Sequence, residues 1–247
     1  MTKVHCKECG AITFGNENSS KDSTVLLSEV TAETVPRIES GPWDPCFGGG
    51  LALGSVSLIS GAPGGGKSTL ALQMVGAVAA RTNREGLYVA AEEDGKQVRD
   101  RASRLGIARP DLIRLVSAVG GFSGDLGAIM KERKPVITVV DSLPGLIGKE
   151  DNSGLGEEFA KWLKSRAIEH DMPIIIINHV NKAEDAAGTM ALQHDVDTTV
   201  TLFADEHSEA REMFTVKNRF GPAHVTVRLL MTEHGIIPLG KGGNDDD

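Results

Sequence analysis

The chain contains 247 residues, of which 40% are hydrophobic, and it carries a formal net charge of −8. No apolar run approaches the ~20 residues of a membrane-spanning helix and the polar N-terminus lacks the features of a signal peptide, so we expect a cytoplasmic protein that does not enter a membrane. The acidic balance repels phosphate over the whole molecule, and any contact with nucleic acid therefore requires a local basic surface.

The first residues resemble part of a metal-binding module. Cys6 and Cys9 have the spacing of half a zinc knuckle, but tetrahedral zinc needs four ligands and the second pair is missing. A vestigial stub is therefore the favoured interpretation, and a zinc site is the alternative. We expect residues 1–25 to comprise this remnant and a flexible linker, 26–240 to form the main domain, and 241–247 to be an acidic disordered tail.

The glycine-rich segment after the apolar run 56–59 is the most informative stretch. It reads Gly61, Ala62, Pro63, Gly64, Gly65, Gly66, Lys67, Ser68 and Thr69, which is the pattern G-x-x-x-x-G-K-[ST]. Apolar residues at 70–75 suit a helix, so strand, loop and helix follow in the required order. The glycines let successive N–H groups converge on phosphate oxygens. The segment predicts a nucleoside triphosphate site, with Lys67 on the outer phosphates and Ser68 on Mg²⁺.

Downstream, apolar strands alternate with helices. We expect strands at 86–91, 112–116, 136–140 and 174–177, and helices at 95–105, 125–133 and 156–169, with Asp94 as a helix N-cap. Continuous apolar strands between helices indicate an α/β fold with a parallel sheet covered on both faces. Consecutive strands at 196–203, 211–218 and 224–231 then predict an antiparallel extension.

Acidic residues come directly after two of these strands. Ligands of open parallel sheets bind at the carboxyl ends of strands, where such residues would meet the glycine-rich loop. We expect Asp141 to hold a water on the Mg²⁺ at Ser68, and Glu92 to orient or deprotonate the water that attacks the γ-phosphate, with Glu93 as the second choice. The alternative is that these carboxylates only cap turns and helices.

Asn178 and His179 close the strand at 174–177 and precede a polar loop. Polar groups at that strand end could sense the γ-phosphate and pass its state to the loop. A purely structural histidine is an equally good interpretation.

Two cations lie close together near the C-terminus. If Lys217 and Arg219 lie on a strand, alternation places both on one face, with Phe220 on the other. Such a pair suits a phosphate or nucleic-acid contact, including action on the nucleotide of a neighbouring subunit. The alternative is a basic edge strand that resists aggregation.

Taken together, these motifs resemble the ATPase core of the bacterial RadA/Sms proteins, a branch of the RecA-like superfamily. The resemblance runs from about residue 36 to 239 and includes 44–51, the glycine-rich loop, 88–93, 101–106, 139–142, 179–182, 192–197 and 217–221. The His-Val-x-Lys and Lys-Asn-Arg-Phe-Gly patterns, in this order and spacing, are far more specific than the loop alone.

The resemblance implies a RecA-like P-loop ATPase domain at 26–240 that uses ATP and Mg²⁺. It implies a homo-oligomer, expected to be a hexameric ring, that binds single-stranded or branched DNA in its channel and drives branch migration in recombinational repair. The implied roles are nucleotide and Mg²⁺ binding by Lys67, Ser68 and the Walker B residue Asp141, catalysis by Glu92, and trans action by Lys217 and Arg219. The loops at about 143–156 and 180–191 would face the channel.

Three departures from the family pattern qualify this expectation. The four-cysteine zinc finger keeps only Cys6 and Cys9, and the large Lon-protease-like domain that helps to assemble the ring is absent from this sequence. Gly65 stands where the family usually has a bulkier apolar residue, which should loosen the loop without removing a phosphate ligand.

Other functions are compatible with the same residues. One is an ATP-gated switch module similar to KaiC-like proteins, with slow turnover. Another is a replication or recombination ATPase of the DnaB or RecA type, such as a phage could encode. A small-molecule kinase is the weakest alternative, because no arginine-bearing lid segment is evident.

Overall fold

The computed structural model describes residues 2–5, 12–15, 34–119, 124–147, 154–179, 192–205 and 208–239. The chain divides into two compact units, Met1–Thr34 and Val35–Asp247. In the first unit, β1 (Thr2–His5) and β2 (Ile12–Gly15) form an antiparallel pair. The candidate zinc ligands Cys6 and Cys9, the predicted acidic tail and the loop 180–191 lie outside the described residues.

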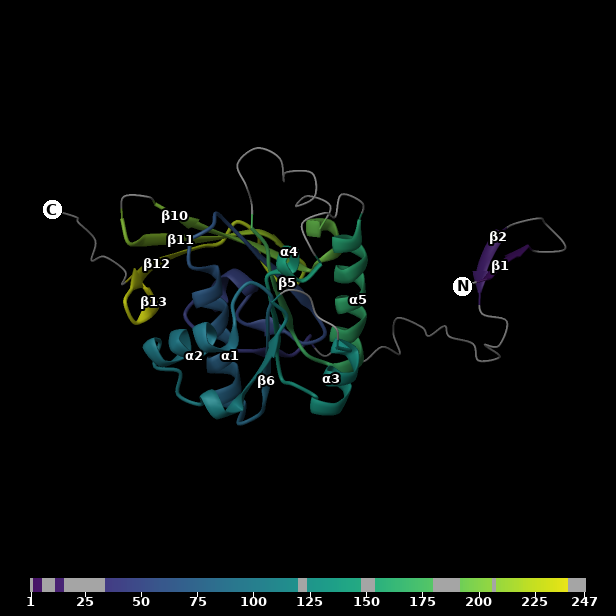
Figure 1. The fold of residues 1–247 in the computed structure, drawn as a ribbon. Helices are drawn as coiled ribbons and strands as arrows, with labels where there is room; N and C mark the ends of the chain where they lie inside the picture. Colours follow the sequence, from purple (N-terminus) through teal and green to yellow (C-terminus); the bar gives the residue numbers. More distant parts are fainter. Residues whose placement is uncertain are drawn as a thin grey trace. The chain divides into compact units, whose positions relative to one another are not determined.

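The second unit is built on one nine-stranded sheet (Figure 1). Its mutually parallel strands are β5 (Val56–Ser60), β6 (Gly86–Ala90), β7 (Ile113–Ser117), β8 (Thr138–Asp141), β9 (Ile174–Ile177) and β10 (Thr198–Ala204). The strands β11 (Ala210–Asn218), β12 (Thr226–Thr232) and β13 (Gly235–Pro238) extend it antiparallel. The order is β13-β12-β11-β10-β5-β9-β8-β6-β7. The predicted fold class is confirmed, and β13 is an addition to it.

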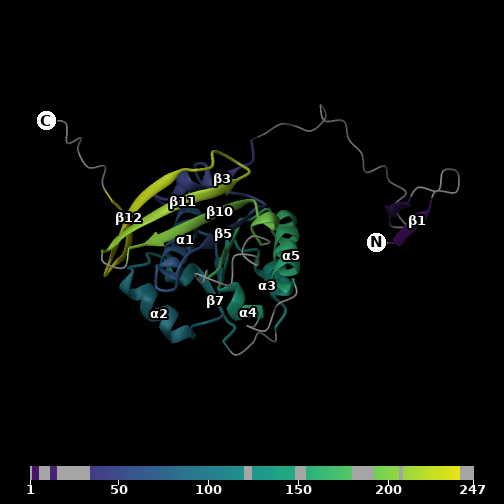
Figure 2. The same cartoon turned by 90° about the horizontal axis from the view of Figure 1, so that it is seen from above.

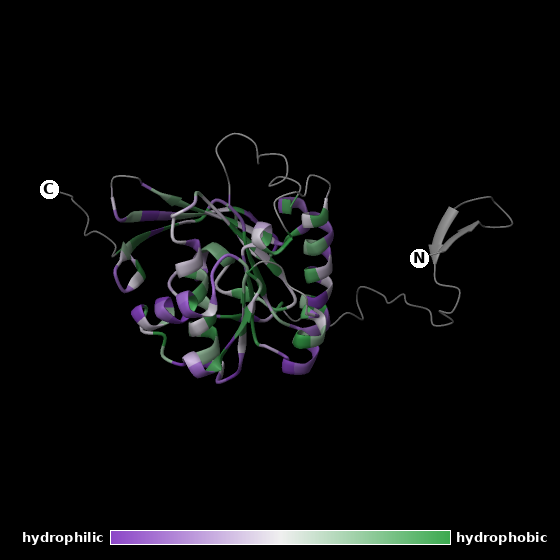
Figure 3. Ribbon diagram, in the orientation of Figure 1, coloured by the Kyte–Doolittle hydropathy of each residue, from purple (hydrophilic) through white to green (hydrophobic). Residues whose placement is uncertain are grey.

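Helices cover both faces of this sheet, as Figure 2 shows from above. One face packs against α1 (Lys67–Thr82) and α2 (Gly95–Arg104), and the other against α3 (Leu126–Arg133), α4 (Leu143–Ile147) and α5 (Leu155–His170). Successive strand residues alternate between the two cores, so Ile175 packs with the α1 side and Ile176 with the α5 side. Figure 3 shows the resulting hydrophobic interior between hydrophilic outer helix faces.

The segment before β5 folds against the α1 side of the sheet. It contains β3 (Arg37–Ile38), β4 (Leu51–Ala52) and the 3-10 helix η2 (Asp44–Phe47). Trp43, Cys46 and Phe47 are buried there in the same core as α1. This segment therefore closes one end of the main core, which explains the apolar character of residues that sequence periodicity leaves unassigned.

A local signal accounts for the start of α2. The Asp94 side chain accepts hydrogen bonds from the N–H groups of Lys96 and Gln97, and the Gln97 side chain accepts one from the Asp94 N–H, so the predicted N-cap is confirmed as a capping box.

Among the described residues, no helix combines the length and apolar character that a bilayer crossing requires.

Candidate active site

The glycine-rich loop joins the carboxyl end of β5 to the first residue of α1, as its motif predicts. Gly61, Gly64 and Gly66 have φ angles of 150°, 77° and 100°, a region that L side chains rarely occupy. A Cβ atom on Gly61 would lie 2.3 Å from the carbonyl oxygen of Leu202 in β10. The loop can therefore follow this path only because glycine stands at these positions.

Lys67 lies under the loop, with 2% of its surface exposed. Its Nζ donates hydrogen bonds to the carbonyl oxygens of Gly61 (2.8 Å) and Ala62 (2.7 Å). Burial lowers the pKa of this ammonium group, and the nearby carboxylates of Asp141 and Glu92 oppose that shift. A buried cation next to two carboxylates, in a loop of converging amides, is an environment suited to a polyphosphate.

Asp141 ends β8 and is buried beside the loop, as predicted. The Tyr88 hydroxyl donates a hydrogen bond to its Oδ2, whereas Oδ1 is buried without a hydrogen-bond partner among the described residues. Burial raises the pKa of the Asp141 carboxyl, against the effects of Tyr88 and of the nearby Ser68 hydroxyl. Burial also raises the pKa of Tyr88 well above its ordinary value, so the phenol stays a donor.

Glu92 follows β6 and is the exposed member of the acidic pair. Ser142 donates a hydrogen bond to its Oε1, and His179 Nε2 lies 3.1 Å from its Oε2. A Cβ atom on Gly145 of α4 would come within 2.9 Å of Glu92 Cγ, so α4 packs directly against this side chain. Glu92 is thus oriented from two sides, by the ends of β8 and β9.

Glu93 points to a different partner. Its carboxylate forms a half-buried ion pair with Arg101 of α2. Glu93 therefore faces α2, whereas Glu92 faces Ser142 and His179 at the carboxyl ends of β8 and β9.

The residues present fit a magnesium-bound triphosphate. The unpartnered buried Oδ1 of Asp141 is a ready acceptor for a water on Mg²⁺, and the Ser68 hydroxyl lies beside it. No cluster of three or more His, Cys, Asp or Glu side chains suited to a metal ion occurs in the described ranges. Proteins usually bind Mg²⁺ through one or two side chains together with phosphates and waters.

Asn178 and His179 stand at the carboxyl end of β9, between β5 and β8 in the sheet. The Asn178 N–H donates to the carbonyl oxygen of Ile59, in the strand that leads into the loop. The structure therefore brings His179 together with Glu92 and places Asn178 next to β5.

Lys217 and Arg219 lie elsewhere. β11 ends at Asn218, so Arg219 falls just beyond the strand, and a register shift separates the pairing of Thr199 from that of Val200. Of the two cations, only Lys217 therefore meets the condition of lying on the strand. Both side chains nevertheless reach the same segment: Lys217 bonds to main-chain oxygens at 193–196, and Arg219 Nη1 lies 3.5 Å from Oδ1 of Asp197.

These cations are at the amino end of the parallel strands. Asp197 precedes β10, and its N–H donates to the carbonyl oxygen of Val56, the first residue of β5. The loop begins at the other end of β5, five residues away, which corresponds to roughly 16 Å along a strand. Within one chain, Arg219 and Lys67 therefore lie at opposite ends of the parallel strands.

Sequence reasoning missed Tyr88, Ser142 and Arg101 as neighbours of the acidic residues. A signal for Tyr88 was present, because it is the single tyrosine of the chain and lies in a continuous apolar strand, where a buried hydroxyl needs a partner. No comparable signal marks the other two.

Comparison with known proteins identifies the family of the chain. Residues 21–185 match a protein family described as an AAA domain. The chain is similar to the DNA repair protein RadA of Haemophilus influenzae, with 35% identity over 230 residues that cover 90% of this chain and 49% of the relative. For RadA of Bacillus subtilis the identity is 32% over 248 residues, covering 97% and 52%. The chain spans about half the length of these curated relatives.

Solved structures share the fold. A KaiC-like protein from Pyrococcus horikoshii superposes with a TM-score of 0.68 at 20% identity, covering 83% of this chain and 99% of that one. The RadB recombinase superposes with a TM-score of 0.62 at 22% identity, covering 79% and 96%. The family model matches most of the chain, and Lys67, Asp141 and Glu92 lie together at the carboxyl ends of the strands. The chain therefore belongs to the AAA domain family and is a P-loop ATPase of RecA-like fold.

Proposed function

We propose that this protein is a single-stranded-DNA-stimulated ATPase of recombination or repair that works as a ring. The observation that carries the proposal is the division of the machinery between the two edges of one sheet. Lys67, Asp141 and Glu92 lie at the carboxyl edge, whereas Lys217 and Arg219 lie at the amino edge. Such a division suits neighbouring subunits that complete one another's sites.

Nucleotide binding requires a rearrangement of Lys67. In the structure its ammonium group is held by two loop carbonyls, and these bonds are to be exchanged for phosphate oxygens. The amides of the loop and the amino end of α1 then face the same phosphates. Ser68 and Asp141 would hold Mg²⁺ with its waters, and the metal would neutralise charge on the phosphates.

For hydrolysis, Glu92 accepts a hydrogen bond from the attacking water and orients it toward the γ-phosphate. Ser142 and His179 fix the two oxygens of Glu92 from the ends of β8 and β9. His179 also precedes the loop 180–191, so its contact with Glu92 links the hydrolytic site to a segment proposed to face DNA. This is the sensor role proposed for Asn178 and His179.

In trans, Arg219 would stabilise negative charge on the nucleotide of the next subunit, and Lys217 is the second candidate for this role. Their separation from the Lys67 site of the same chain supports this assignment, because neither side chain extends the length of β5. We expect a hexameric ring, with DNA contacts in the loop 180–191 and near 143–156, a stretch expected to be a loop whose first residues instead form α4. The name DNA repair protein of the RadA relatives supports the choice of DNA as partner.

The deciding experiment measures ATP hydrolysis with and without single-stranded DNA, alongside the mass of the assembly with nucleotide. We expect DNA to raise the turnover of the wild-type protein and Lys67→Ala to abolish it. A second arm mixes Arg219→Ala with Glu92→Gln subunits, which should recover turnover at shared interfaces. Hydrolysis indifferent to DNA at low salt, or no recovery in subunits shown to co-assemble, contradicts the proposal.

One observation favours an ATP-gated switch as a second candidate. Both carboxylate oxygens of Glu92 already have hydrogen-bond partners, which would slow its use as a base. Tight ATP binding with very slow turnover, unchanged by DNA, would support this candidate over the motor.

A further inference from the structure

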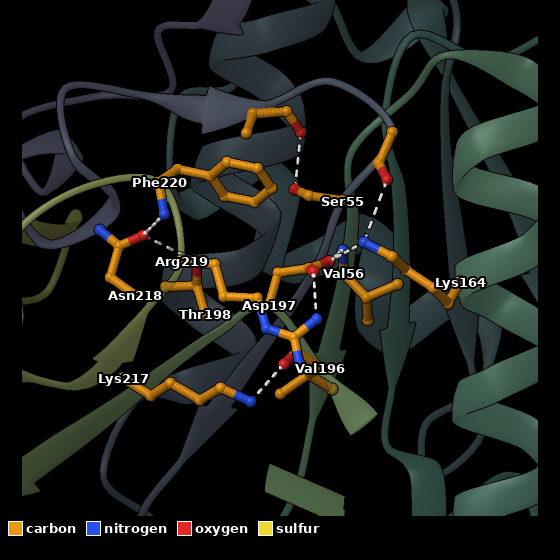
Figure 4. A network of polar contacts seen from close by, with 12 residues as sticks. Ser55, Val56, Lys164, Val196, Asp197, Thr198, Lys217, Asn218, Arg219 and Phe220 are labelled. Carbon is orange, nitrogen blue, oxygen red and sulfur yellow. Dashed lines mark hydrogen bonds and ion pairs between the residues drawn. The ribbon is translucent and has the colours of Figure 1, made fainter. Parts of the chain in front are cut away.

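We propose that Asp197 is a positioning residue whose carboxylate holds the Arg219 guanidinium at the amino edge of the sheet, ready for the nucleotide of a neighbouring subunit. This inference rests on the proposed trans action of Arg219. Asp197 lies between the end of a short helical segment, 192–195, and the start of β10. Figure 4 shows it at the centre of a polar network that joins β5, α5, β10 and the end of β11.

The two oxygens of the Asp197 carboxylate have different partners. Oδ2 accepts a hydrogen bond from the Val56 N–H at 2.9 Å and forms an ion pair with Lys164 of α5. Oδ1 faces Arg219, whose Nη1 is 3.5 Å away. The first oxygen is therefore fixed by the body of the protein, and this fixes the direction in which the second one points.

Exposure also differs across this network. The Asp197 side chain is 2% exposed, whereas that of Arg219 is 55% exposed. The Arg219 N–H donates to the Asp197 carbonyl oxygen at 3.0 Å, so its main chain is anchored as well. One end of the guanidinium meets a buried carboxylate and the rest lies at the surface, which is the arrangement expected of a group that acts on another molecule.

Lys217 has a different part in the same network. Its ammonium group has three protons, and its three acceptors are the carbonyl oxygens of Gln193, His194 and Val196, at 2.8, 3.2 and 2.8 Å. Reaching a neighbour's phosphate would cost these bonds. Lys217 therefore ties β11 to the segment that carries Asp197, and Arg219 is the cation left available.

A charge argument gives the expected effect of removing the carboxylate. Asp197 lies between Lys164 and Arg219, and Lys217 is close by. Without the negative charge, the cations repel one another across a partly buried site, and Arg219, at 55% exposed against 24% for Lys164, is the cation freer to move into solvent. The guanidinium then leaves its position while the P-loop at the other sheet edge keeps its structure.

The test uses Asp197→Asn, which keeps the shape and an acceptor for the Val56 N–H but loses the charge. We expect DNA-stimulated kcat to fall roughly 10- to 100-fold, as for a misplaced catalytic group, with the KM for ATP within about twofold of wild type. Asp197→Glu restores the charge and should recover part of kcat, although its extra methylene group makes it the less stable variant. The matched control is Asp195→Asn, which removes a carboxylate two residues away that pairs with Lys161; it should leave kcat unchanged.

Mixed assemblies distinguish positioning from a merely structural role. If Asp197 acts through Arg219 in trans, mixing Asp197→Asn with Glu92→Gln recovers turnover, since the second subunit supplies an intact Arg219. If Asp197 only supports β5 and the P-loop of its own chain, no recovery follows, because neither kind of subunit then has a complete hydrolytic site. Should Asp197→Asn not fold, the same mixture is made with Asp197→Glu, whose residual defect must also be recovered.

The outcomes separate this inference from the proposed function. Recovery with Arg219→Ala but not with the Asp197 variants overturns the inference and leaves the trans mechanism standing. A wild-type kcat for Asp197→Asn also overturns it. Absence of recovery with Arg219→Ala itself overturns the proposed trans mechanism, and the inference falls with it.

Discussion

The Tyr88 hydroxyl donates a hydrogen bond to one carboxylate oxygen of Asp141, and the other oxygen is buried without a hydrogen-bond partner in the described part of the chain. Tyr88 lies on β6 and Asp141 on the neighbouring β8, with both side chains on the α1 side of the sheet. The phenol thus sets the orientation of the carboxylate, and in the proposed site the other oxygen would accept a hydrogen bond from a water on Mg²⁺.

We predict that Tyr88→Phe raises the Mg²⁺ concentration that hydrolysis requires. A hydrogen bond to a charged group contributes about 1.5–3 kcal/mol, part of which holds the carboxylate in place, so the Mg²⁺ concentration for half-maximal turnover should rise about 3- to 10-fold. Saturating Mg²⁺ should restore most of kcat, and ATP binding in EDTA should not change. An unaltered Mg²⁺ titration would show that Tyr88 has no part in orienting Asp141.

Substitutions of Lys67 and Glu92 should separate ATP binding from ATP hydrolysis. Glu92→Gln removes the base but leaves the phosphate cradle, so hydrolysis should fall by about 10² to 10⁴ while a fluorescent ATP analogue still binds. Lys67→Ala removes the buried cation and should lose both. Equal ATP affinities for the two variants would contradict this division of roles.

The path of the P-loop beside β10 predicts unequal effects of two glycine substitutions. Gly61→Ala combines a positive φ with a Cβ atom 2.3 Å from a backbone oxygen, so it should lower the free energy of unfolding by about 2–4 kcal/mol. Gly65 has an ordinary φ, and its added Cβ would lie 3.1 Å from the Ala62 oxygen. Gly65→Ala should change stability by less than about 1 kcal/mol, as urea denaturation can measure.

The buried thiol of Cys46 should make the stability of the fold depend on pH, independently of the nucleotide site. Burial raises the pKa of its thiol, which donates to the Met213 carbonyl oxygen at 3.4 Å. The raised pKa means that the thiol stabilises the fold at pH values below its ordinary pKa of 9.0, and that this contribution is lost as the pH rises through the folded-state value.

The measurement uses a variant with Cys6→Ser and Cys9→Ser, in which Cys46 is the remaining cysteine. At pH 8 the native protein should react with a maleimide slower than the unfolded protein by a factor on the order of 100 or more, since reaction requires opening of the core. The unfolding midpoint of this variant and that of the same variant with Cys46→Ala added should converge above pH 9. Rapid labelling of the native protein would refute burial of this thiol.

Much of the site was predictable because its signals are local. The P-loop is recognisable because glycines, lysine and serine must follow one another in a single turn, and Asp94 caps α2 through bonds to residues two and three positions on. Asp141 and Glu92 could be placed at the carboxyl edge because each directly follows an apolar strand. The resemblance of the motifs to RadA/Sms proteins supplied the same roles independently.

The sequence by itself indicated most strands of the sheet, the cap at Asp94 and the P-loop, because these depend on residues within a few positions of one another. Only the tertiary structure decided that Tyr88 lies beside Asp141, since this requires β6 and β8 to be neighbours although the two residues are 53 positions apart in the sequence. It also decided that Arg219 meets Asp197 at the edge opposite the P-loop, through the parallel pairing of β10 with β5 and the antiparallel return of β11. The physical reason is that strand order follows from which faces the helices bury together, a balance over the whole core that no local pattern contains.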